Sequence, residues 1–64
     1  MLTIDTNHVR SAAQVGGLSG ARAIAREGGE CTILLADGRL RLYYRDNGKL
    51  RQRTWAKSAW RFNR

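Results

Sequence analysis

The 64-residue sequence has no proline, one cysteine, one histidine and no long apolar run. A single cysteine, Cys31, cannot close an internal disulfide, which excludes a disulfide-stabilised secreted scaffold and indicates a reducing compartment. The apolar runs are too short to cross a bilayer, and residues 1–5 lack the basic region and apolar block of a signal peptide. We therefore expect a cytoplasmic protein. The sequence also lacks the amphipathic helix with bulky apolar residues that docks on an anionic membrane surface, so we expect no membrane binding.

Side chains that support catalysis or hold metals are also scarce. Nothing in the sequence brings His8 and Cys31 together, and we expect Cys31 to be a buried structural thiol. The five carboxylates are scattered, so they indicate neither a metal site nor an acid–base pair. The glycine-rich residues 16–20 lack the lysine and the preceding strand of a phosphate-binding loop and indicate a bend. We expect no enzyme activity, no metal and no cofactor.

Acidic residues are few, and their distribution along the chain is uneven. Twelve lysines and arginines against five aspartates and glutamates give a net charge of +7. Residues 1–38 carry three basic and four acidic side chains, whereas residues 39–64 carry nine basic side chains and one acidic. A basic segment of this density usually meets phosphate.

The chain is long enough for one domain only, and residues 7–27 predict a helical cover of two short helices or one kinked helix. Capping side chains at residues 5–7 favour a short helix over residues 8–15, glycines at 16 and 17 interrupt it, and helical spacing resumes over residues 18–27. Alternating apolar residues at positions 1–4 permit a short strand. A domain this small has a thin core. Together with open sheet edges, that thin core favours a homodimer.

Residues 31–55 predict a three-stranded antiparallel meander, which makes the fold class α+β. A two-residue loop at Asp37-Gly38 pairs Leu35 with Leu40 and Ile33 with Leu42. The face toward the helices then consists of Ile33, Leu35, Leu40, Leu42, Tyr44 and Leu50.

The second turn, at residues 46–48, has two candidate loop lengths. A two-residue Asn47-Gly48 loop places Arg51 and Arg53 on the apolar face, where unpaired guanidinium groups are costly. A three-residue loop with a left-handed Gly48 pairs Tyr44 with Leu50 and turns both arginines outward. We therefore predict the three-residue loop.

In this register the outer face of the sheet carries six cations and two aromatic rings. Arg41 faces Arg53, and two like charges directly across a sheet repel unless an anion lies between them. Arginine grips phosphate or guanine with two hydrogen bonds, and aromatic rings stack on bases. We predict nucleic-acid binding, to DNA rather than RNA, by Arg39, Arg41, Tyr43, Arg45, Lys49, Arg51, Arg53 and Trp55.

Two alternatives stay open at this point. The arginine stems also suit a solvated outer face with no ligand, and the charge also suits a small interaction module or inhibitor that docks on an acidic protein. In the aromatic and basic tail, residues 56–64, Trp60 and Phe62 favour a role in closing the core. Trp55 fits either role, because a bulge after Arg53 would turn it inward.

At the level of architecture alone, a three-stranded sheet on helical cover resembles the arm-binding domains of some phage integrases, which read DNA with the sheet. No sequence motif carries this resemblance. It implies a sheet-reading DNA-binding module. Separately, and from the small size alone, we expect a phage or mobile-element protein.

Overall fold

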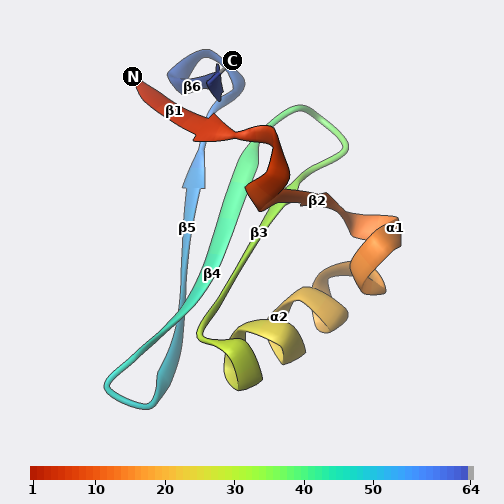
Figure 1. The fold of residues 1–64 in the computed structure, drawn as a ribbon, viewed down its shortest axis with the longest axis vertical. Coiled ribbons are helices and arrows are strands. Elements are labelled where there is room, and N and C mark those ends of the chain that lie inside the picture. The colour runs from red at the N-terminus through yellow and green to blue at the C-terminus, as the bar shows by residue number, and fades with distance from the viewer. Residues whose placement is uncertain (64) are drawn as a thin grey trace.

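The computed structural model describes residues 1–63 and confirms the α+β class (Figure 1). Arg64, the last residue of the predicted tail, lies outside the described residues. The elements in chain order are β1 (Leu2–Asp5), a 3-10 turn (Thr6–His8), β2 (Val9–Ser11), α1 (Ala12–Val15), α2 (Gly17–Gly28), β3 (Glu30–Leu34), β4 (Leu40–Asp46), β5 (Lys49–Trp55), a second 3-10 turn (Lys57–Ala59) and β6 (Trp60–Asn63).

The strands form two sheets. The main sheet has the order β2-β3-β4-β5, with β2 parallel to β3 and the other neighbours antiparallel. β1 and β6 form a parallel two-stranded sheet at one end of the main sheet, near both chain ends (Figure 1). The meander and the N-terminal strand agree with the sequence prediction, whereas β2 and β6 were not predicted. No helix among residues 1–63 has the length and apolar character to span a membrane.

α1 begins at Ala12, four residues after the predicted start of the first helix at residue 8. Asp5 caps the 3-10 turn by accepting a 2.9 Å hydrogen bond from the Asn7 backbone N–H, and residues 9–11 then pair with β3 as a strand. Ser11 and Gln14 form a reciprocal capping box that starts α1. Gly16, with φ 84°, ends α1 in a left-handed conformation and leads into α2.

The core lies between α2 and one face of the main sheet. Ala21 and Ala25 of α2 are fully buried against Cys31, Ile33 and Tyr43 of the sheet. Because these helical side chains are small, α2 lies close to the strands and a full tyrosine ring fits beneath it. We call this side of the sheet the helix-covered face.

The first hairpin has a three-residue loop, so the predicted pairing is wrong by one residue. Gly38, with φ 92°, donates a 3.0 Å hydrogen bond to the Leu35 carbonyl, and Leu35 N–H donates a 2.8 Å bond to the Arg39 carbonyl. Ile33 therefore lies opposite Arg41 and not opposite Leu42. As a consequence, Tyr43 packs beneath α2, and Leu40, Leu42 and Tyr44 face the other way.

The second hairpin has a two-residue loop, and its predicted pairing is also wrong by one residue. Asp46 pairs with Lys49 across Asn47 and Gly48, whose φ values of 52° and 79° suit a type I′ turn. Arg51 and Arg53 thus share a side with Tyr44 and Leu42. No helix covers that side, so the two guanidinium groups stay exposed and the burial cost that we expected does not arise. We call it the open face, which carries Leu40, Leu42, Tyr44, Lys49, Arg51, Arg53 and Trp55.

Candidate nucleic-acid interface

The eight predicted contact residues are divided between the two faces of the sheet. Arg39, Arg41, Tyr43 and Arg45 lie on the helix-covered face, and Lys49, Arg51, Arg53 and Trp55 lie on the open face. Arg41 is opposite Thr54, so the predicted facing pair of Arg41 and Arg53 does not exist. The expectation that an anion bridges these two arginines is therefore wrong.

Tyr43 is part of the core, with only 1% of its surface exposed. The Cζ atoms of Arg22 and Arg41 each lie 5.9 Å from its ring centroid, and Arg41 Nη1 donates a 3.3 Å hydrogen bond to its hydroxyl. Arg41 Nε also donates a 3.0 Å bond to Thr54 Oγ1 on β5. The Tyr43 ring therefore has no free face for a base, and Arg41 holds β4, β5 and the core together.

Arg39, which directly precedes β4, and Arg45 on β4 also have partners within the chain. Arg39 Nε pairs with Asp37 Oδ2 at 2.7 Å, and Arg39 N–H donates a 3.1 Å bond to Asp37 Oδ1. That backbone bond, aided by the guanidinium, lowers the pKa of Asp37. Arg45 Nη1 donates a 2.7 Å bond to the Arg26 carbonyl near the C-terminus of α2, where a cation is favourable.

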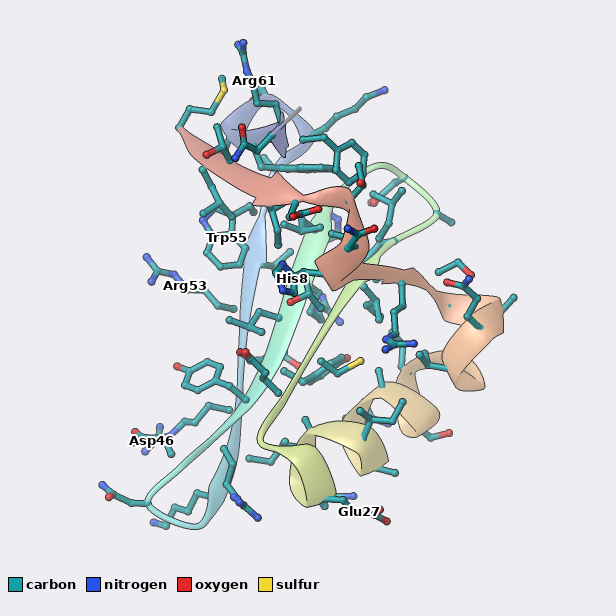
Figure 2. All side chains as sticks on the ribbon, viewed as in Figure 1. His8, Glu27, Asp46, Arg53, Trp55 and Arg61 are labelled. Carbon is teal, nitrogen blue, oxygen red and sulfur yellow. The ribbon has the colours of Figure 1, made fainter. Side chains whose placement is uncertain are left out.

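The cations of β5 have no such partners. Lys49, Arg51 and Arg53 are exposed, and within residues 1–63 their side chains make no hydrogen bond or ion pair. They occupy alternate positions of one strand, so they point the same way about 7 Å apart, a spacing close to that of successive phosphates in an extended strand. Figure 2 shows Arg53 extending outward from β5.

Two aromatic rings lie beside these cations on the open face. Tyr44 is half-buried directly opposite Arg51, and Trp55 is half-buried opposite Leu40. The Arg53 Cζ atom lies 5.2 Å from the centroid of the Trp55 ring. This cation–π contact places a phosphate-binding group next to a ring on which a base can stack.

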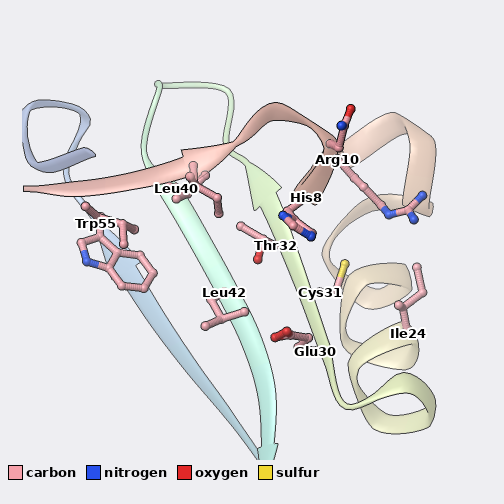
Figure 3. Close-up of a pocket in the computed structure, with 12 residues that line it drawn as sticks. His8, Arg10, Ile24, Glu30, Cys31, Thr32, Leu40, Leu42 and Trp55 are labelled. Atoms are coloured by element: carbon pink, nitrogen blue, oxygen red, sulfur yellow. The ribbon is translucent and has the colours of Figure 1, made fainter. Parts of the chain in front are cut away.

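A cavity of about 440 Å³ lies between the open face, the β1 segment and the first 3-10 turn (Figure 3). The apolar side chains of Leu2, Ile4, Leu40, Leu42 and Trp55 line it, together with polar groups of Asn7, His8, Glu30 and Thr32. It continues past the edge of β3 to Arg10, Ile24 and Cys31. Sequence reasoning missed this cavity, because it exists only when β1 folds over the main sheet.

Cys31 is buried and free, as the sequence predicts. Burial raises the pKa of its thiol, and the positive charge of Arg10 offsets part of that rise. The thiol therefore stays protonated at neutral pH. Within residues 1–63 no three histidine, cysteine or carboxylate side chains lie close enough to hold a metal ion.

Comparisons with protein-family models, with curated proteins and with solved structures found no match to this chain. Its function has to be inferred from the arrangement of its own side chains.

Proposed function

We propose that this chain binds nucleic acid through the open face of β4 and β5. Lys49, Arg51 and Arg53 contact phosphates, and Tyr44 and Trp55 pack against bases or sugars. One observation carries the proposal: within residues 1–63 the side chains of Lys49, Arg51 and Arg53 make no hydrogen bond or ion pair, whereas those of Arg39, Arg41 and Arg45 are all hydrogen-bonded.

The acidic groups on the same face do not neutralise these cations. Asp46 lies opposite Lys49 and Glu30 lies opposite Tyr44 in the strand pairing, yet neither carboxylate forms an ion pair with a cation of β5. Like charges at alternate positions of one strand repel and lower the stability of the fold. A phosphate chain laid along β5 removes that repulsion and gives arginine its preferred planar partner.

The experiment compares two double variants that remove the same charge from opposite faces. Binding of DNA and RNA strands of equal length, single and duplex, is measured by fluorescence anisotropy at about 50 and about 200 mM salt. Arg51→Gln with Arg53→Gln should weaken binding at least about tenfold and lower the salt slope by about 2. The matched control, Arg39→Gln with Arg45→Gln, should change affinity less than about threefold.

Two results would contradict the proposal. Equal losses in both double variants, with thermal unfolding showing both folded, would mean that net charge alone attracts the polyanion. A salt-independent response, or no binding to any strand, would favour the other interpretation of the charge, a module that docks on one acidic protein.

A further inference from the structure

We propose that the cavity beneath β1 receives one unstacked base of a single nucleic-acid strand, so that the protein prefers single strands to duplexes. This inference rests on the proposed function, because the phosphates of the same strand lie on Arg51 and Arg53. It goes further in naming the form of nucleic acid and the place where a base is held.

Trp55 connects the cationic strand to the cavity. Its ring lines the cavity (Figure 3), and the Arg53 guanidinium carbon lies 5.2 Å from the centroid of that ring. Leu40 and Leu42, directly opposite Trp55 and Arg53 on β4, also line the cavity. A strand with a phosphate on Arg53 therefore has its adjoining base within reach of this opening.

The size and lining of the cavity suit a flat heterocycle. Its volume of about 440 Å³ lies within the range of about 300–1,000 Å³ that is typical of small-molecule sites. Apolar side chains from β1 and β4 can contact the faces of a base, and Trp55 offers a stacking surface. The Asn7 amide, the His8 imidazole and the Thr32 hydroxyl supply donors and acceptors for the edge of a base.

The cavity is lined by one charged group of each sign. Glu30 repels phosphate and accepts hydrogen bonds from an exocyclic amino group, and Arg10 lines the part beyond the edge of β3. Lys49, Arg51 and Arg53 lie outside the cavity, on β5. The larger positive charge therefore lies along β5, which places the phosphates there and the uncharged base in the cavity.

This arrangement discriminates against a duplex. A base in a duplex is paired and stacked, so it has to leave the helix before it can pass beneath an overhanging segment. A base in a single strand is splayed out at far lower cost, which is why single-strand readers use aromatic platforms. Binding to a duplex should then use the cations alone.

The test uses the full chain, whose tryptophans are Trp55 and Trp60, and assigns to Trp55 the quenching that Trp55→Leu abolishes. The probes are oligodeoxycytidylate, a base-free abasic strand of equal length and a duplex of equal length. Oligodeoxycytidylate should quench Trp55 fluorescence and bind about tenfold more tightly than the abasic strand, since stacking contributes the difference. The abasic strand and the duplex should leave the fluorescence of Trp55 unchanged.

Two substitutions test whether the preference for a strand with bases over the abasic strand arises in the cavity. Trp55→Leu keeps apolar cover over Leu40 and should abolish the preference for bases over the abasic strand. His8→Ala removes a side chain that is exposed and makes no hydrogen bond within residues 1–63, so it stays informative if Trp55→Leu fails to fold. It should weaken oligodeoxycytidylate binding about threefold, and abasic binding not at all.

The outcomes separate the two proposals. If all three probes bind equally without quenching, and Arg51→Gln with Arg53→Gln still weakens them, the cavity inference is overturned and the proposed function stands. If no probe binds, both are overturned.

Discussion

Tyr43 and Tyr44 show how much one position in a strand decides. They are neighbours in β4, yet Tyr43 is 1% exposed beneath α2, whereas Tyr44 is half-buried on the open face. The Tyr43 hydroxyl accepts a hydrogen bond from Arg41, and the Tyr44 hydroxyl has no partner within residues 1–63. The first tyrosine therefore belongs to the core and the second is available to a ligand.

Replacing each tyrosine by phenylalanine should separate these roles. Tyr43→Phe should lower the free energy of unfolding by about 1 kcal/mol, because a partly buried Arg41 N–H loses its acceptor. Tyr44→Phe, the matched control, should change it by less than about 0.5 kcal/mol. Urea denaturation of both variants measures the difference. Equal losses would show that the hydroxyl of Tyr43 contributes nothing specific.

At the scale of elements, the junction of α1 and α2 depends on one close backbone approach. A Cβ atom added at Gly20 would lie 1.6 Å from the Val15 carbonyl oxygen and 2.7 Å from its carbon. Gly16 and Gly17, with φ values of 84° and 79°, turn the chain just before this contact. The glycine-rich segment that the sequence indicates as a bend is thus also a packing contact between two helices.

Alanine at two glycines of α2 should have effects of opposite sign. Gly20→Ala should destabilise the protein by about 2–4 kcal/mol, because the Val15 backbone has to move. Gly28→Ala meets nothing within 4 Å and should stabilise it by about 0.5–1 kcal/mol, since alanine is the better helix former. Thermal unfolding of both variants gives the comparison. Stabilisation by both substitutions would contradict the close approach.

The hairpins show where sequence reasoning stops. The strands and the positions of both turns follow from apolar alternation and from the Asp-Gly and Asn-Gly pairs, but each pair permits a loop of two or three residues. The predicted two-residue first loop places Leu40 on the face toward the helices. With that face apolar, Arg51 and Arg53 avoid it only if the second loop has three residues. In the structure β1 lines the space next to Leu40 on the open face, so the main sheet has apolar residues on both faces.

The site could be predicted only in part for the same reason. Lys49, Arg51, Arg53 and Trp55 share a face in any register, because they are alternate residues of one strand. Which β4 side chains accompany them depends on loop length, and the cavity depends on pairing between residues nearly 60 positions apart, such as Leu2 and Trp60. Neither feature has a local signal in the sequence.

At the scale of the whole molecule, the β1–β6 pair closes one end of the main sheet. Trp60 Nε1 donates a 3.0 Å hydrogen bond to the Gly38 carbonyl, and the Trp60 and Phe62 rings meet edge to face at 5.0 Å. These contacts connect the last strand to the first hairpin loop, and the pairing of β6 with β1 holds β1 beside the cavity. The outer edges of β2 and β5 have no partner strand within residues 1–63, and the homodimer stays a prediction.

Salt should affect the stability of the fold and its binding in opposite directions. The chain has a net charge of +7, and within residues 1–63 only Arg39 and Asp37 form an ion pair, so screening removes more repulsion than attraction. Raising salt from about 50 to about 300 mM should raise the Tm by a few degrees, even as it weakens nucleic-acid binding. Arg51→Gln with Arg53→Gln should reduce this rise, because these two exposed cations contribute repulsion and form no ion pair within residues 1–63. Circular dichroism melts of both proteins measure it, and a Tm that falls with salt would mean that attractive pairs such as Arg39 with Asp37 outweigh the repulsion.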